Sequence, residues 1–129
     1  MASLKTEATE LSVGFGLLGI DPRAVDQNRI ANLFQGTLTE DKFQSYQSEY
    51  RRDFPFYSEF VGLGENLRTR YRLFNNLDRL RWLGPQQQAT TTALPKDIEA
   101  ANTPVSVKAE SNVVYNLSPY NLFVNLPNG

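Results

Sequence analysis

Cysteine and histidine are both absent from this chain. Their absence removes the disulfide framework, the thiolate nucleophile, the usual zinc ligand sets and the side chain best suited to proton transfer near neutral pH. We therefore expect the protein not to be an enzyme, and we expect neither a metal site nor a cofactor. A chain without cysteine suits a reducing cytosol and an oxidising exterior equally, so its cysteine usage leaves localisation open.

Long apolar runs are absent as well. A membrane-spanning helix needs roughly 20 apolar residues, and the best candidate stretch, residues 11–20, is interrupted by three glycines. A secretory signal would place a basic region before the apolar stretch and small residues after it. Here only Lys5 precedes the stretch, and Asp21 and Pro22 follow it. We expect no transmembrane segment and no signal peptide.

The remaining composition is that of a soluble globular protein, with 129 residues, of which 40% are hydrophobic and 21% charged. This length suffices for one domain. A net charge of −1 gives the whole molecule no attraction to nucleic acid or to an anionic membrane. The charges are nevertheless unevenly distributed. Residues 1–50 carry four basic and seven acidic side chains, a net −3, whereas residues 51–82 carry seven basic and four acidic ones, a net +3.

Hydrophobic periodicity predicts an α+β chain with a mainly helical N-terminal body of about three helices, residues 1–84, and an extended, strand-forming C-terminal arm, residues 105–129. Residues 85–104 between them are polar and read as a linker, with one short helical turn near residues 96–101. Within the arm, alternating apolar residues predict strands over residues 105–109 and 113–117, and we expect the body to fold without it.

Capping signals place the helices of the body. Asp21 followed by a proline predicts a helix over residues 22–35. Thr37 or Thr39 is expected to cap the next helix. The longest helical pattern covers residues 65–83 and ends before a glycine and a proline. The aromatic stretch between these two helices is expected to pack across them rather than extend them.

Three glycines near the N-terminus, Gly14, Gly16 and Gly19, match the G-x-G-x-x-G spacing of dinucleotide-binding turns. Such a site needs a buried strand before the glycines and a helix that starts on them. Alternation over residues 11–15 predicts only a short extended segment, and Pro22 restarts the chain after the third glycine. We favour a glycine-rich turn or close backbone packing over a nucleotide site.

Arginine dominates the helix predicted over residues 65–83. At about 100° per residue, Arg68, Arg72 and Arg79 share one side of that helix. Guanidinium groups form bidentate pairs with carboxylates or phosphates. We expect a charged interface in which these arginines meet carboxylates, either of the acidic first half of the same chain or of a neighbouring copy. Contact with nucleic acid is the alternative.

The C-terminal arm contains a near-repeat, with YNLSP at residues 115–119 and YNLFV at residues 120–124. The prolines at positions 119 and 127 suit an edge strand or an arm laid on a partner better than a central strand. Tyrosine and leucine are large anchors for pockets on another chain. The alternative is a two- or three-stranded sheet on this chain's own helices. The expected partner-binding residues are Tyr115, Leu117, Tyr120, Leu122 and Phe123.

These features predict a non-enzymatic structural subunit of a larger assembly, which docks on other protein chains through its C-terminal arm. A virus or phage particle, with this chain as a capsid or tail component, fits a small body with an extended arm. The protein would then be found in the virion, and otherwise in the cytoplasm. The first alternative is a small nucleic-acid-binding protein that uses the arginine-rich helix. The second is a subunit of a cellular multi-protein complex. A homo-oligomer fits the same features.

Overall fold

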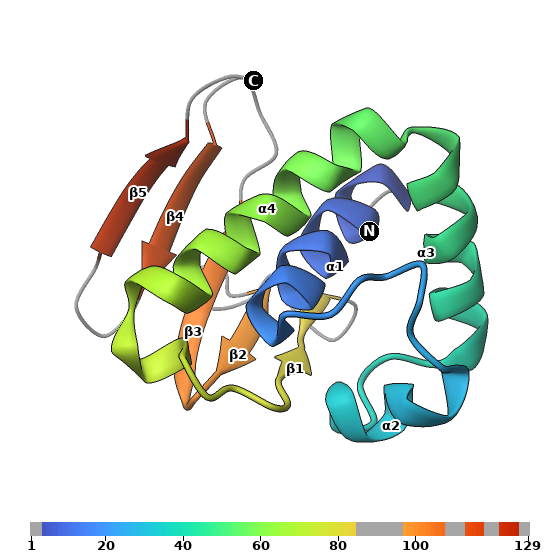
Figure 1. The fold of residues 1–129 in the computed structure, drawn as a ribbon, viewed down its shortest axis with the longest axis horizontal. Helices are drawn as coiled ribbons and strands as arrows, with labels where there is room; N and C mark the ends of the chain where they lie inside the picture. The colour runs from blue at the N-terminus through green and yellow to red at the C-terminus, as the bar shows by residue number, and fades with distance from the viewer. Residues whose placement is uncertain (1–3, 85–96, 108–112, 118–121, 127–129) are drawn as a thin grey trace, which may run out of the picture.

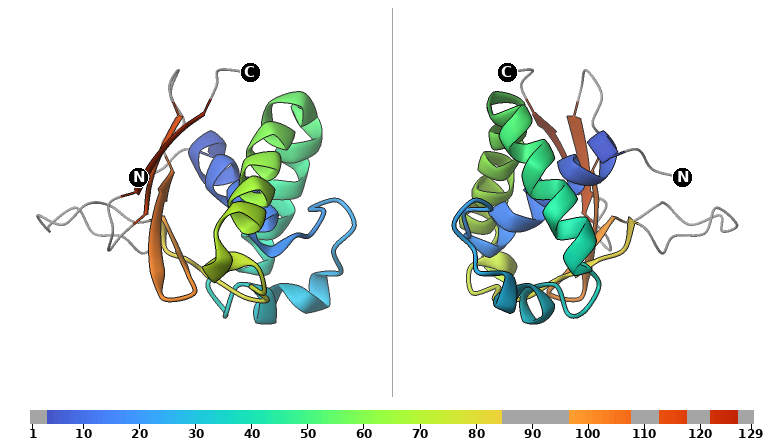
Figure 2. Two further views of the ribbon diagram at one scale, coloured as in Figure 1. Left: turned by 60° about the vertical axis from the view of Figure 1, so that its left-hand side comes forward. Right: turned by 90° about the vertical axis from the view of Figure 1, so that its right-hand side faces the viewer.

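The computed structural model describes residues 4–84, 97–107, 113–117 and 122–126, the last two ranges by their backbone. Its helices gather on one face of an antiparallel sheet (Figures 1 and 2). This arrangement confirms the α+β class. Helix α1 contacts α3, α4, β1 and β3, so it lies where the helices meet the sheet.

The helices of the described residues comprise three long helices, with short helical turns between the first two and after the last. Helix α3 begins after the cap predicted at Thr37 or Thr39. Thr39 caps it by accepting a hydrogen bond from the Lys42 amide. Pro55 lies in the first turn of α4, where its missing N–H has no helical acceptor to lose. The elements are α1 (Leu4–Leu18), η1 (Gln27–Arg29), α2 (Ile30–Leu33), α3 (Glu40–Arg52), α4 (Phe54–Arg70) and η2 (Arg72–Phe74).

Two of the N-terminal expectations are wrong. Residues 11–15 are helical rather than extended, and every residue of α1 from Ala8 to Leu18 is buried. A helix buried on all sides has no apolar stripe and therefore no helical periodicity to read. The helix expected over residues 22–35 is reduced to η1 and α2. The Asp21 carboxylate accepts from the Arg23 amide at 2.9 Å, so it forms a local turn in place of a helix start.

The helix predicted over residues 65–83 is also wrong. Helix α4 begins earlier, within the aromatic stretch expected to lie outside the helices, and it ends at Arg70. Tyr71 adopts an extended backbone conformation. The Asn75 side-chain amide donates to the Arg68 carbonyl at 2.5 Å, which satisfies one of the carbonyl groups left free at the helix end. The apolar spacing past residue 70 therefore belongs to a turn and a strand.

The sheet has the strand order β1-β2-β3-β4-β5, with every neighbouring pair antiparallel. A two-residue turn joins β2 to β3, with Ala101 and Asn102 both at positive φ, as hairpin turns of this length require. The helical turn expected near residues 96–101 is therefore replaced by a strand. The strands are β1 (Arg81–Trp82), β2 (Ile98–Ala100), β3 (Thr103–Val107), β4 (Val113–Leu117) and β5 (Leu122–Leu126).

One hydrophobic core joins the helices to the first three strands. Phe15 of α1 stacks on Tyr46 of α3 at 5.5 Å between ring centroids, and Phe34 packs edge-on against Phe15 at 5.0 Å. Val105 and Val107 belong to the same buried cluster. These two strand residues lie in the core of the helical body. The expectation that an arm separate from the body begins at residue 105 therefore does not hold for them. The predicted linker from residue 97 onward is likewise part of the sheet.

Helices α1 and α4 cross in direct backbone contact. A methyl group at Gly16 would collide with the Val61 carbonyl, and one at Gly64 would collide with the Val13 carbonyl. Only glycine allows two helices to approach this closely. The expectation of close backbone packing is thus confirmed at Gly16, and the glycine motif lies within and just after a buried helix rather than before one.

Candidate functional site

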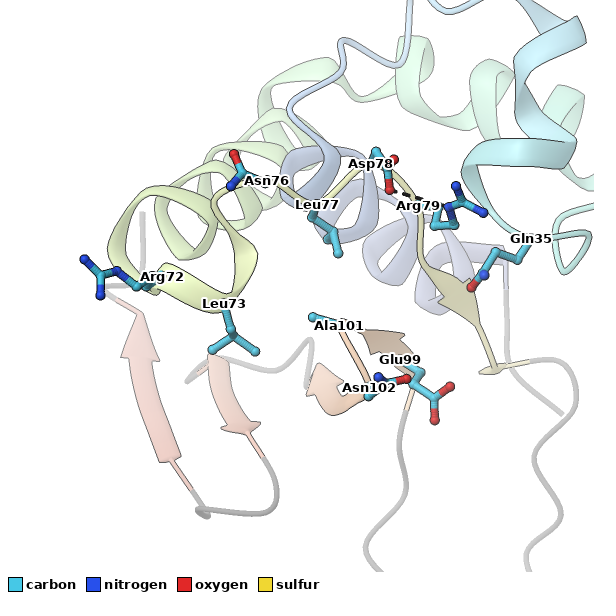
Figure 3. Close-up of a pocket in the computed structure, with 10 residues that line it drawn as sticks. All are labelled: Gln35, Arg72, Leu73, Asn76, Leu77, Asp78, Arg79, Glu99, Ala101 and Asn102. Atoms are coloured by element: carbon cyan, nitrogen blue, oxygen red, sulfur yellow. Dashed lines mark ion pairs between the residues drawn. The ribbon is translucent and has the colours of Figure 1, made fainter.

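A charged hollow opens between the segment after α4 and the β2–β3 turn (Figure 3). Its volume is about 390 Å³. A second hollow beside it, also lined by Asp78 and Arg79, adds Arg29 and Asn32 of the α2 region. The first hollow is lined chiefly by Gln35, Arg72, Asp78, Arg79, Glu99 and Asn102.

The backbone around this hollow contains every non-glycine residue at positive φ in the described part of the chain, namely Gln35, Ala101 and Asn102. Clusters of strained residues often mark functional sites. Here the two residues of the β2–β3 turn are explained by the turn itself, and Gln35 precedes Gly36 where the chain reverses after α2. The strain follows from the turns and does not by itself indicate a ligand.

The charges of the hollow do not converge on one point. Arg72 and Arg79 lie at opposite ends, and their guanidinium groups point away from each other (Figure 3). Arg79 makes an exposed ion pair of 3.5 Å with Asp78, and Glu99 accepts from Arg81 at 3.2 Å. Two guanidinium groups that point apart cannot clamp a single anion. A charged interface at Arg72 and Arg79 stays a prediction.

Arg68 is separated from the other two predicted interface arginines. Its Nη1 donates to the Leu17 carbonyl at 2.9 Å and to the Leu77 carbonyl at 2.7 Å. It therefore joins the end of α1 to the segment after α4. The three arginines do not share a helix face, because α4 ends before Arg72, and the partners of Arg68 are backbone carbonyls rather than the carboxylates that we expected.

We expect Arg68→Gln to lower the free energy of unfolding by about 1.5–3 kcal/mol, because two charge-assisted hydrogen bonds to backbone carbonyls are lost. Arg72→Gln is the matched control. Its side chain has no partner among the described residues, so the change should stay within about 0.5 kcal/mol. Urea unfolding followed by circular dichroism measures both. Equal effects of the two substitutions would contradict the structural role of Arg68.

The expected partner-binding residues lie on or beside the last two strands. In the sheet register Tyr115 opposes Val107 and Leu117 opposes Val105. Leu122 and Phe123 are in β5, at the end of the sheet (Figure 1). Tyr120 lies outside the described residues. The structure therefore places four of the five on a single strand pair, and their role in binding a partner stays a prediction.

The two edges of the sheet differ in how they are covered. Beside β1, the Leu80 amide donates to the Leu33 carbonyl and the Trp82 amide to the Thr37 hydroxyl, both at 2.8 Å. These bonds cover that edge with the chain around α2. The other edge is the outer side of β5, which no strand of the described residues joins. An uncovered edge offers a row of N–H and C=O groups for pairing.

Sequence reasoning missed a buried pair of carboxyl groups, Glu10 of α1 and Asp97 just before β2. The exposed fractions of these residues are 5% and 9%. Trp82 Nε1 donates to Glu10 Oε1 at 2.9 Å, and the two carboxyl groups are hydrogen-bonded to each other. Burial first, and then the negative Asp97, raise the pKa of Glu10 to about 8. The only sequence signal is an acid within a helix that is otherwise largely apolar.

This acid pair lies apart from the two hollows. Neither carboxyl group lines either of the two hollows described above. Across the described ranges, no three acidic side chains gather where they could hold a metal ion. Nor does any helix in those ranges have the length and apolarity to cross a membrane. That the protein is not an enzyme stays a prediction.

Comparison with known proteins leaves the residues themselves as the basis for function. No family model, no curated protein and no solved structure matches this chain.

Proposed function

We propose that this protein is a non-enzymatic structural subunit of a larger assembly, and that it docks by pairing the outer edge of β5 with a strand of another protein chain. The observation that supports this proposal is the outer edge of β5, which no strand of the described residues joins. Strand addition of this kind derives affinity from main-chain hydrogen bonds, so it needs no pocket and no catalytic group.

The composition of the last strands supports docking at this edge. Proteins usually protect an open edge with lysine, other charged residues or proline within the strand. Residues 111–129 contain no charged residue at all, and four of the five residues of β5 are apolar. The two prolines of this stretch lie before and after β5, at positions 119 and 127, and none lies within it. An edge without these protections is suited to a partner strand.

The register divides the expected anchors between the two faces of the sheet. Residues opposite each other in a ladder share a face. Positions 115 and 117 oppose Val107 and Val105, whose side chains are buried in the core, so they continue the face that β3 turns toward the helices. By alternation, position 123 falls on the opposite face. Pairing through the main chain of β5 is therefore a better docking mode than side-chain anchors on β4.

The kind of assembly is the finer part of the proposal. A virus or phage particle, in which this chain would be a capsid or tail component, and a cellular multi-protein complex would both use such an edge. The nucleic-acid alternative loses the helix on which it depended, because α4 ends at Arg70. Arg72 and Arg79 remain exposed, so binding to nucleic acid is kept as an outcome of the experiment.

Proline substitutions in β5 test the docking edge. Successive residues of a strand direct their N–H groups to opposite sides. Of the two single substitutions Phe123→Pro and Val124→Pro, one therefore removes an N–H donor that faces β4 (the inward substitution), and the other removes a donor that faces away from β4 (the outward substitution). We expect the inward substitution to lower the melting temperature. The outward one should leave melting unchanged and release the chain from its native complex, measured by sedimentation of cell extracts.

Two results would count against docking at β5. One is a wild-type chain that sediments in native extracts as a monomer of 14.6 kDa. The other is a pair of prolines with identical effects on melting and on sedimentation. A complex that disappears after nuclease treatment, and after the double substitution Arg72→Glu and Arg79→Glu, would instead support the nucleic-acid alternative.

A further inference from the structure

The buried acid pair lies at the junction of α1 with the sheet. Trp82 of β1 donates to Glu10, and the Val107 amide of β3 donates to Asp97 Oδ2 at 2.7 Å. The backbone of Asp97 is also fixed, since its carbonyl accepts from Leu83 at 2.8 Å and its amide donates to Val105 at 3.0 Å. The pair thus connects one helix to three strands.

The hydrogen bond between the two carboxyl groups requires one proton on the pair. Each carboxyl group already accepts a hydrogen bond from a fixed N–H group, on Trp82 and on Val107 respectively. A further bond between the two carboxyl groups needs a hydrogen that one of them must carry. Two ionised carboxylates side by side, both shielded from water, would repel each other at the junction of α1 with the sheet.

We propose that Glu10 and Asp97 form a proton-dependent latch, which fastens the sheet to α1 while the pair holds one proton and loosens the junction when the second carboxyl group ionises. Among the residues that the structure describes, the other charged groups near the pair are Glu7, on the same helix, and Lys42 of α3. Lys42 Nζ pairs with Glu7 at 3.0 Å and lies 5.9 Å from the Trp82 ring centroid. Because Lys42 is engaged by Glu7, it does not neutralise the acid pair. The latch requires no partner chain.

The direction of the pH dependence follows from where the proton is held. The ordinary pKa of the Glu10 carboxyl group is 4.5, and burial with Asp97 beside it raises this pKa to about 8. Between these values the folded chain keeps a proton that the unfolded chain releases. Stability therefore falls as pH rises through this window and levels off above it.

Trp82 is the single tryptophan of the chain, so its fluorescence reports on the latch directly. We expect a fluorescence change with a midpoint near pH 8 in a titration from pH 6 to pH 9. In Glu10→Gln the change should be absent, because the side chain at position 10 no longer titrates. Its amide oxygen still accepts from Trp82, and its amide NH₂ still donates to Asp97. The melting temperature of the wild type should fall from pH 5 to pH 8, and that of Glu10→Gln should stay level.

Glu49→Gln is the matched control. Hydrogen bonds from Arg52 and then from Tyr57 lower the pKa of Glu49 to about 2, so this substitution should leave the change near pH 8 intact. Burial raises the pKa values of Tyr46, Tyr50 and Tyr57 above their ordinary value of 10, so these groups titrate outside the scan.

Asp97→Asn provides a second variant if Glu10→Gln fails to fold. It removes the neighbouring negative charge, so the midpoint should move to lower pH by about one unit. The latch is refuted if wild-type fluorescence is flat between pH 6 and pH 9, if Glu10→Gln keeps the change, or if Asp97→Asn leaves the midpoint where it was.

Discussion

Replacing Gly16 or Gly64 with alanine is expected to destabilise the protein by about 3 kcal/mol, a large share of the roughly 5–15 kcal/mol typical of a domain. The added methyl group would meet the backbone of the facing helix, Val61 or Val13, and a backbone carbonyl cannot turn aside as a flexible side chain can. The helices must then separate, which opens the core around α1. Urea unfolding followed by circular dichroism measures the loss.

Gly62 is the matched control for this pair, because it lies in the same helix and a methyl group there would meet nothing within 4 Å. Gly62→Ala should stabilise the protein by about 0.5–1 kcal/mol, since alanine loses less conformational entropy in a helix than glycine. If all three alanine substitutions were equally tolerated, α1 and α4 would not be in backbone contact.

A chain that ends at Gly84 is expected to lose its cooperative unfolding transition, contrary to the expectation that the body folds alone. Truncation removes Ile98, Val105 and Val107 from the core, and burying each such side chain contributes roughly 1.5–3 kcal/mol. It also removes the Asp97 partner of Glu10. Thermal melting followed by helical circular dichroism at pH 6 tests this expectation.

A chain that ends at residue 107 is the control for the truncation. It keeps β1 to β3 and therefore keeps all three of those core side chains. We expect it to melt cooperatively, at a lower temperature than the full chain. A chain ending at Gly84 that melts as sharply as the full protein would show that the first strands add little to the core.

The sequence patterns succeeded where structure is decided locally. Helix α3 was predicted from its N-cap, and Thr39 has that role. The strand over residues 113–117 matches β4. In both cases the signal is a cap or an alternation that operates within a few residues.

The patterns failed where tertiary contacts decide the structure. Helix α1 shows no periodicity because it is buried on every side, and α4 ends where the Asn75 side chain and an extended Tyr71 turn the chain away. The spacing of apolar residues continues past that point, so the predicted helix extended too far. Such endings depend on groups that come together only in the folded chain.

The candidate sites show the same division. Of the three predicted interface arginines, Arg68 is used inside the fold, and only Arg72 and Arg79 line the hollow. Glu10 and Asp97 could not be paired from sequence, because nothing in their spacing relates α1 to the start of β2. Their proximity follows from the crossing of helix and sheet, which no local pattern encodes.

The unequal edges of the sheet also limit what an assembly built on this protein can become. With β1 covered by the chain around α2, only β5 can add a strand, so each copy has a single site for sheet growth among the described residues. Pairing between two copies at this edge would use the same surface on both and would close as a two-fold pair. Among the described residues, pairing between copies at this edge therefore ends in a closed pair rather than in the fibre that an uncharged edge strand can otherwise form.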